Sequence, residues 1–229
     1  MAPPARTAAL SALSLVPLGD AAVTIVLGQG IDLDTNSLVH AVVAAVRAAA
    51  LPWVLDVVPA YASLAVHYDP LHTDHVTVMA ALETFTRATL ESSELHQRDV
   101  REHLIQVRYD GMDLDAVAAT TGLDPEQVVA LHCEPLYTVY MLGFVPGFAY
   151  LGDLHPALVL ERRAEPRASV APGSVAIAGR QSAIYPLRTP GGWHIIGNTV
   201  FRPFDAGATP PCRLAAGDFV RFIPAKSRT

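Results

Sequence analysis

The stretch APGSVAIAGRQSAIYPLRTPGGWHIIGNT, residues 171–199, decides the fold of the second half of the chain. Two short apolar runs, Val175–Ala178 and His194–Ile196, are bounded there by glycine and proline. Glycine accepts the positive φ of a tight turn, and proline cannot donate a hydrogen bond inside a sheet. Short apolar runs between such residues therefore indicate short β-strands joined by tight turns.

The same punctuation continues through the rest of the C-terminal part. The 89 residues from Met141 onward contain 10 of the 15 glycines and 10 of the 18 prolines. Further short runs occur at Thr199–Arg202 and Phe219–Ile223. Many short strands separated by turn residues predict a small β-barrel or β-sandwich.

The N-terminal part has a different pattern, because strand-like runs alternate there with longer stretches of helical periodicity. The order βαββαβ is typical of a ferredoxin-like domain, in which two helices cover one face of an antiparallel sheet. We therefore predict an α+β fold for the whole chain. The four expected strands are Ala21–Leu27, Trp53–Val58, Tyr61–Tyr68 and Leu104–Tyr109.

The two expected helices of this domain are defined by their periodicity and by residues that begin and end them. LVHAVVAAVRAAA, residues 38–50, has apolar residues at helical spacing, and Pro52 stops that helix. A second helix begins at Thr73 or Asp74 and runs to about Leu90. The N-cap candidates of the first helix are Asp34, Asn36 and Ser37.

The polar run ESSELHQRDVRE, residues 91–102, is interpreted as a connector. It predicts one domain over residues 1–98 and a second over residues 99–229. Two short helices are expected at the start of the second domain, at Leu114–Thr120 and Pro125–His132. The first 18 residues are interpreted as a disordered or strand-leading tail rather than a signal peptide.

Composition excludes several classes of function. The net charge is −6 and no basic run occurs, which argues against binding to nucleic acid. No run of eighteen apolar residues is present, so we expect no membrane span. The two cysteines, Cys133 and Cys212, form no CxxC or Cys/His cluster that would suggest a metal site. They fit a reducing cytoplasm, with a single disulfide as the alternative. His132 precedes Cys133, but neighbours on a helix point in different directions and do not form a nucleophile–base pair.

Several long strings in the second half are unusual together. They are MLGFVPGFAYLGDL at 141–154, RRAEPR at 162–167, TPGGWHIIGNT at 189–199 and AAGDFVRFIP at 215–224. With LGD at 18–20 and YDGMDL at 109–114, they closely resemble the allophanate hydrolase subunit 1 family. That family includes one component of bacterial 5-oxoprolinases, the kinase inhibitor KipI and a segment of urea amidolyase.

The resemblance implies a ferredoxin-like N-terminal domain and a cyclophilin-like β-barrel C-terminal domain. It also implies that the chain works with a larger partner of the allophanate hydrolase subunit 2 type, which is the C-type component of 5-oxoprolinases. The expected activity is ATP-dependent opening of 5-oxoproline to glutamate, with ATP as co-substrate. Two alternatives stay open: a carboxyltransferase-type role in urea or allophanate metabolism, and KipI-like inhibition of a sensor histidine kinase.

The loop at Gly143–Phe148 is a candidate substrate-binding element, because Phe144, Gly147 and Phe148 combine backbone freedom with an aromatic wall. A barrel corner that needs the same dihedral angles is the alternative. Gln181 can both donate to and accept from an amide, and Tyr185 adds a hydroxyl group. Both are candidate substrate contacts, with the capping of strand ends as the alternative.

Two residues are candidates for catalysis. Arg167 is expected to contact a carboxylate or phosphate, ahead of Arg162 and Arg163, although a solvated arginine face is the alternative. His132 ends a predicted helix, where the dipole favours the protonated form, and it acts as a general acid or base or caps the helix. The sequence contains no P-loop and no dinucleotide fingerprint. We therefore expect the partner protein to complete any ATP site, and we expect no metal.

Overall fold

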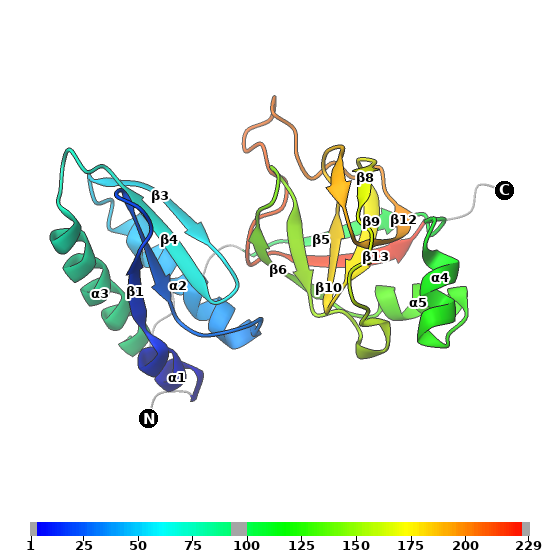
Figure 1. Ribbon diagram of the computed structural model, residues 1–229, viewed down its shortest axis with the longest axis horizontal. Coiled ribbons are helices and arrows are strands. Elements are labelled where there is room, and N and C mark those ends of the chain that lie inside the picture. Colours follow the sequence, from blue (N-terminus) through cyan, green and yellow to red (C-terminus); the bar gives the residue numbers. More distant parts are fainter. Residues whose placement is uncertain (1–3, 93–99, 226–229) are drawn as a thin grey trace. The chain divides into compact units, whose positions relative to one another are not determined.

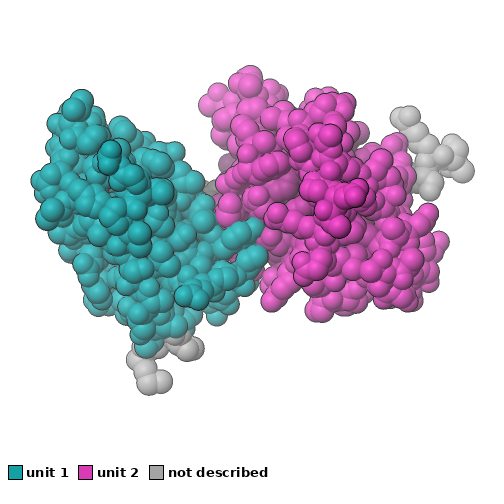
Figure 2. Space-filling view, in the orientation of Figure 1, with its two compact units in different colours: residues 1–99 teal, residues 100–229 magenta. Residues whose placement is uncertain are grey.

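The computed structural model describes residues 4–92 and 100–225 of the 229-residue chain. The chain divides into two compact units, Met1–Asp99 and Val100–Thr229, which Figure 2 colours separately. Most of the polar run expected to connect them, residues 93–99, lies outside the described residues.

The first unit contains one four-stranded antiparallel sheet with the order β1-β2-β4-β3 (Figure 1). Side chains on one face alternate into the core, as in β4, where Leu64, Val66 and Tyr68 are buried. A bulge between Val54 and Asp56 interrupts the pairing of β3 with β4. The strands are β1 (Ser14–Pro17), β2 (Ala22–Val26), β3 (Val54–Pro59) and β4 (Ser63–Tyr68).

Three helices pack against the same core: α1 (Pro4–Ala12), α2 (Leu33–Ala48) and α3 (His75–Glu91). The N-cap of α2 is Asp32, whose carboxylate accepts a hydrogen bond from Thr35 N at 2.7 Å. The cap therefore lies before the three candidates named from the sequence, which are inside the helix. Asp74, one of the two residues predicted to begin the second helix, is the N-cap of α3 and accepts a hydrogen bond from Thr77 N at 2.9 Å.

The predicted βαββαβ connectivity is wrong for this unit. The expected fourth strand forms as β5 (Glu102–Val107), but it pairs in parallel with β13 (Phe219–Pro224) in the second unit. The edge position next to β2 is taken instead by β1, from the segment interpreted as a tail. That segment also forms α1, so the interpretation of residues 4–17 as a tail is wrong as well.

The second unit is built on a seven-stranded sheet with the order β12-β9-β10-β7-β6-β13-β5. A β-bridge between Arg108 and Asn198 joins the ends of the two outermost strands, so the sheet is nearly closed. This agrees with the small β-barrel predicted for the C-terminal part. The remaining strands are β6 (Tyr137–Leu142), β7 (Ala149–Gly152), β9 (Ser174–Ala178), β10 (Gln181–Ile184) and β12 (His194–Asn198).

Additional elements lie on this sheet. Helices α4 (Leu114–Thr121) and α5 (Pro125–Cys133) occupy one end of the unit (Figure 1), followed later by the 3-10 turn η1 (Pro156–Leu158). A separate ribbon pairs β8 (Arg167–Val170) with β11 (Thr189–Gly191). Asp124 and Gln127 form a capping box at the start of α5, with Pro125 in its first turn. None of the helices in the described part of the chain is long and apolar enough to cross a membrane.

Candidate functional site

The two faces of strand β10 lead to two different environments. Ser182 and Ile184 point into the larger core of the barrel. Ala183 points the other way, and Tyr185, just beyond the strand, belongs to the same smaller cluster. Gln181 shares the face of Ala183, because side chains alternate along a strand. The outer face of the sheet therefore carries its own buried cluster.

Aromatic side chains dominate this outer cluster, with Phe148 at its centre. The Phe148 ring lies 4.9 Å from Tyr150, 5.3 Å from Tyr185 and 5.7 Å from Trp193 between ring centroids, each pair edge to face. Phe144 extends the series at 5.5 Å from Phe148. Edge-to-face contacts of this kind favour a fixed arrangement of the rings. The faces of these rings form a rigid aromatic wall.

The loop before β7 holds Phe144 in an uncommon conformation. Val145 N donates to Gly143 O at 2.8 Å, and the turn between them gives Phe144 a φ of +65°. Positive φ is rare for a side chain of this size and recurs at functional sites. The Phe144 ring is 61% exposed. The loop thus presents an apolar ring to the solvent, at a cost in backbone energy.

Gly147 explains how the loop stays in place. Its φ is +79°, and a Cβ atom there would lie 2.6 Å from the Cβ atom of Phe204. Only glycine allows the backbone of this loop to rest directly on the segment that carries Phe204. The barrel-corner alternative and the binding-loop prediction are therefore compatible, because the same glycine anchors the turn that displays Phe144.

The aromatic side chains surround a cavity of about 240 Å³, called the aromatic cavity below. Burial raises the pKa of Tyr150 and of Tyr185, and in each case the positive charge of Arg162 partly offsets that rise. Both hydroxyl groups therefore keep their protons and can donate hydrogen bonds. The lining residues are Phe144, Phe148, Tyr150, Arg162, Pro166, Tyr185, Pro190, Gly191, Gly192 and Trp193.

The structure brings together some of the residues named from the sequence. Phe144, Phe148 and Tyr185 line the aromatic cavity, and Gly147 lies in the loop between the two phenylalanines, against Phe204. Gln181 lies on the same face of the sheet, is 7% exposed and does not line the cavity. Their roles in substrate binding stay predictions.

Arg167 does not line the cavity, because its guanidinium group is bound elsewhere. Its Nη2 donates to Asp113 Oδ1 at 2.6 Å, and Arg163 Nη1 donates to the same oxygen at 3.1 Å. Asp113 is 4% exposed, and its other oxygen accepts from Ile195 N at 2.7 Å. This buried carboxylate holds the guanidinium group that was expected to bind an anion, and it is shared between Arg167 and Arg163.

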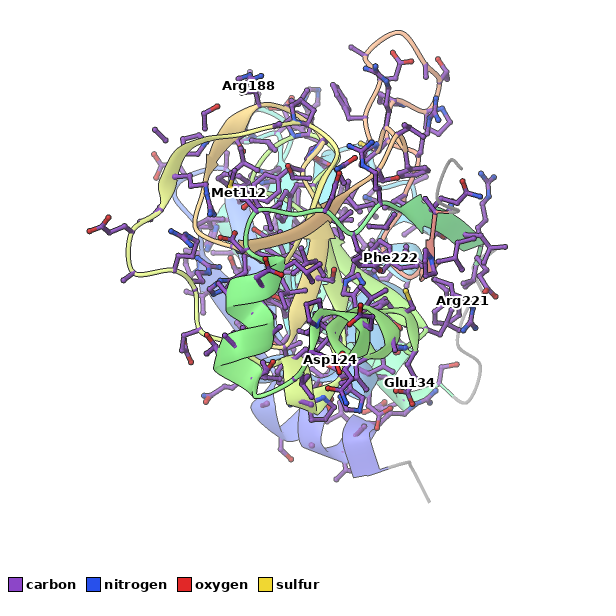
Figure 3. The ribbon with its side chains drawn as sticks, turned by 90° about the vertical axis from the view of Figure 1, so that its right-hand side faces the viewer. Met112, Asp124, Glu134, Arg188, Arg221 and Phe222 are labelled. Atoms are coloured by element: carbon purple, nitrogen blue, oxygen red, sulfur yellow. The ribbon has the colours of Figure 1, made fainter. Side chains whose placement is uncertain are left out.

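His132 lies in the larger core and is completely buried. Its ring packs 4.6 Å from that of Phe222, and Figure 3 shows Phe222 near the middle of the unit, with Arg221 from the same strand at the edge. Ser182 Oγ donates to Ala176 O, so it accepts from His132 Nε2 at 2.8 Å. His132 Nδ1 then accepts from Tyr109 Oη at 2.7 Å.

These contacts describe a neutral histidine. Burial lowers the pKa of His132 to about 3, so the expectation that the helix dipole favours the protonated form is wrong. The imidazole bonds to side chains rather than to the last carbonyl groups of α5, so it is no helix cap. Burial likewise raises the pKa of the Cys133 thiol, which lies 3.1 Å from Tyr109 Oη. His132 does not line the aromatic cavity, and its catalytic role stays a prediction.

The sequence analysis did not name two residues that line the cavity, Trp193 and Tyr150, and it placed Arg162 behind Arg167 as an anion contact. The string PGGW at 190–193, which puts an indole directly after a flexible turn, was the available signal for Trp193. The spacing of aromatic residues at 144, 148 and 150 was the available signal for Tyr150, since the first two flank the turn and the third continues into β7.

A second cavity of about 700 Å³ lies on another part of the unit, near the end of α5. It is lined partly by charged side chains that pair with each other: Arg180 Nη2 lies 3.4 Å from Asp153 Oδ1, and His155 Nε2 lies 3.9 Å from Glu134 Oε2. Such exposed pairs are common on protein surfaces and do not indicate chemistry. The smaller aromatic cavity, with its fixed rings and few polar groups, is the better candidate site.

Comparison with known proteins agrees with the strings singled out in the sequence. Residues 13–214 match the family described as carboxyltransferase domain, subdomain C and D. A Bacillus subtilis protein named as the B-type component of 5-oxoprolinase is 35% identical over 224 residues, 90% of each chain. A protein of the same name from Escherichia coli O157:H7 is 39% identical over 212 residues, which cover 91% of this chain and 94% of the relative.

Solved structures extend the comparison. The crystal structure of TTHA0988 superposes with a TM-score of 0.80 at 39% identity, over 91% of this chain. This chain spans 40% of the length of that protein. The urea amidolyase of K. lactis has the same fold over 93% of this chain, with a TM-score of 0.75 at 15% identity. From the match over residues 13–214 and the two relatives of nearly equal length, the chain belongs to the carboxyltransferase subdomain C and D family, together with proteins named as the B-type component of 5-oxoprolinase.

Proposed function

We propose that this chain is one subunit of an ATP-dependent 5-oxoprolinase and acts with a larger subunit to convert 5-oxoproline to glutamate. The observation that carries the proposal is the similarity to two proteins named as the B-type component of 5-oxoprolinase, over about nine-tenths of each chain. The aromatic cavity supports it independently. Its volume of about 240 Å³ suits a small ring rather than a drug-sized molecule or a peptide.

The chemistry of the substrate fits the lining of the cavity. 5-Oxoproline is a five-membered lactam with one carboxylate, so it offers a flat ring, a carbonyl oxygen, an N–H group and a negative charge. Phe148 and Trp193 provide apolar surfaces for the ring, and the protonated hydroxyl groups of Tyr150 and Tyr185 can donate to its oxygens. An enclosing apolar wall with a few polar groups is typical of small-molecule sites.

ATP and the larger partner belong to the same proposal. An unstrained lactam resists hydrolysis, and transfer of a phosphoryl group from ATP to its oxygen makes the lactam carbon a better electrophile for water. The sequence has no P-loop or dinucleotide fingerprint. We therefore assign completion of the nucleotide site to the larger subunit, and we expect the isolated chain to show no 5-oxoproline-dependent ATPase activity.

Reconstitution tests this function. The chain is co-purified with a larger subunit of the allophanate hydrolase subunit 2 type and with a third, lactam-hydrolase subunit, and glutamate and ADP are measured with 5-oxoproline and ATP. We expect product from the full set and none when this chain is omitted. Turnover by the isolated chain would contradict the assigned division of labour. A complete complex with no 5-oxoproline-dependent ATPase activity would contradict the function itself.

Two tryptophan variants connect the activity to the cavity. Trp193→Leu removes an indole that lines it, whereas Trp53→Leu makes the same change in the first unit. We expect Trp193→Leu to lower kcat/KM at least tenfold, and Trp53→Leu to leave it within about twofold, because only the first change alters the wall of the cavity. Equal values for both variants would separate the activity from the cavity.

One specific observation favours a second candidate. The matching family is described as a carboxyltransferase domain, so carboxyl transfer to urea is the alternative function. The reconstituted complex is therefore also incubated with carboxybiotin and urea. Formation of a carboxylated urea product, without glutamate from 5-oxoproline, would replace the proposed function with this one.

A further inference from the structure

Three arginines in the segment RRAEPR, residues 162–167, have different surroundings. Arg163 and Arg167 both donate to Asp113 Oδ1, at 3.1 and 2.6 Å. Arg162 lines the aromatic cavity and is exposed. Within residues 4–92 and 100–225 it forms no ion pair and no hydrogen bond to another side chain. Arg163 and Arg167 therefore share one carboxylate, whereas the guanidinium group of Arg162 has no carboxylate partner in the described part of the chain.

Asp113 is placed unusually for its position in the chain. It is the N-cap residue of α4, where an aspartate normally accepts a hydrogen bond from its own helix, but its side chain makes no such bond. The carboxylate instead points to β12 and to the two arginines. Giving up a cap costs about 1 kcal/mol. The geometry indicates that the carboxylate acts on the segment around Arg162.

Asp113 joins the two segments that form one side of the cavity. Arg163 N donates to Gly192 O at 2.8 Å, and a ring nitrogen of His194 lies 2.9 Å from Glu161 O. Asp113 adds the two guanidinium contacts on one side and Ile195 N on the other. Arg162 lies between the anchored positions 161 and 163, so its Cα atom is held while its side chain is free to point into the cavity.

We propose that Arg162 is the anion-binding residue of the aromatic cavity and that Asp113 is the positioning residue that holds it there. The ligand class is a small planar ring that bears one carboxylate. The rings select its shape, and Arg162 selects its charge through charge-assisted hydrogen bonds. This inference rests on the proposed function, since it names how that substrate is recognised, and it replaces Arg167 with Arg162 as the expected anion contact.

Ligand binding to the full-length chain tests the proposal directly. In a Trp53→Phe background the remaining tryptophan, Trp193, lies in the cavity wall and reports occupancy by its fluorescence. The two probes are 5-oxoproline and its neutral carboxamide, which keeps the ring and removes the charge. We expect the unchanged site to bind the carboxylate at least tenfold more tightly than the carboxamide.

Two matched variants distinguish the loss of the positive charge at Arg162 from the loss of a positive charge elsewhere on the same unit. Arg162→Gln is expected to weaken the binding of 5-oxoproline at least tenfold and to change that of the carboxamide less than twofold. Arg188→Gln removes an exposed arginine of the same unit that bonds to Ser169 and does not line the cavity. Arg188 lies at the edge of the unit in Figure 3. This control is expected to bind both probes as the parent protein does.

Asp113→Asn tests positioning. Loss of the carboxylate charge loosens Arg163 and Arg167, so we expect the preference for the carboxylate over the carboxamide to fall at least threefold. A merely structural role would weaken both probes equally and leave that ratio unchanged. The double variant with Arg162→Gln should then show no further loss of preference, because both changes act through the same guanidinium group.

The outcomes distinguish this inference from the proposed function. Binding in the cavity that depends on Arg162, in a complex that makes no glutamate, supports the inference and overturns the function. Glutamate formation by the complex with an unchanged KM in Arg162→Gln overturns the inference and keeps the function. If neither probe changes Trp193 fluorescence, the same titration is followed through KM of the reconstituted complex, where an unchanged value in Arg162→Gln again overturns it.

Discussion

Acid should destabilise the barrel unit through one residue, His132. Its pKa is about 3 in the folded protein, against an ordinary value of 6.5, because it is completely buried beside Tyr109 and Ser182. Between these two pH values His132 is therefore protonated in the unfolded chain and neutral in the folded chain. Stability from this residue is complete above about pH 6.5 and is lost progressively as the pH falls toward about 3.

The magnitude follows from the size of that window. Each pH unit below the ordinary value costs about 1.4 kcal/mol as long as the folded protein leaves His132 neutral. At about pH 5 the free energy of unfolding should therefore be about 2 kcal/mol lower than at about pH 7.5 from this residue alone. This is a large fraction of the stability of a typical domain.

Urea unfolding of the Trp53→Phe protein measures the effect, because Trp193 then reports the barrel unit alone. His132→Gln keeps a group that can donate to Ser182 and accept from Tyr109, yet it cannot take up a proton. It should be less stable than the parent at neutral pH and should lack this part of the acid dependence. His155→Gln, a change of another histidine in the same unit, is the control and should keep the parental slope.

An unchanged slope in His132→Gln would refute the reasoning. So would an NMR titration in which the ring of His132 takes up its proton above about pH 5. The same spectra identify the tautomer, which should carry its hydrogen on Nε2, because Ser182 Oγ donates to Ala176 O and can only accept from the ring.

Three other predictions concern the cavity and its supports. Phe144→Gly removes an exposed ring and also relieves the strain of a φ of +65°. The unfolding free energy should therefore stay within about 1 kcal/mol of the parent value, while the binding of 5-oxoproline weakens. A loss of stability in parallel with the loss of binding would contradict this. Gly147 and Gly30 have similar φ values, +79° and +83°, but of the two only Gly147 faces Phe204. Gly147→Ala should therefore destabilise the barrel unit by about 2 kcal/mol more than Gly30→Ala destabilises the first unit. Equal losses of unfolding free energy in urea would exclude that contact. Asp113→Asn should lower the unfolding free energy by about 2 kcal/mol by leaving two guanidinium groups without their carboxylate, and a calorimetric change below about 0.5 kcal/mol would show that the contacts contribute little.

Local patterns in the sequence placed about half of the elements of the barrel unit: strands β5, β9, β12 and β13 and helices α4 and α5. The run Thr199–Arg202, expected as a strand, does not form one, and strands β6, β7, β8, β10 and β11 were not predicted. Strand β5 was found, but its partner was not. Periodicity shows that a segment is extended, whereas the choice between two sheets depends on contacts with residues far away in the chain.

For the candidate site, the sequence named Phe144, Phe148 and Tyr185, and the structure places all three around one cavity, while their part in substrate binding stays a prediction. Arg167 and Arg162 could not be told apart from the sequence, because the ion pair that holds Arg167 joins it to Asp113, more than fifty residues earlier in the chain. His132 was misjudged for a related reason. Its position at a helix end was visible, while the burial that sets its pKa was not.

The place of β13 in the barrel has a consequence for how the chain matures on the ribosome. This strand lies between β6 and β5 and pairs with both, although it is the last strand of the sheet in sequence order. Until residues 219–224 leave the exit tunnel, β5 has no neighbour on that side, and β6 presents an open edge that can pair with other chains. All four strands of the sheet in the first unit are synthesised well before β13. Chaperone binding during synthesis should therefore be directed to the second unit, and most strongly just before its last strand appears.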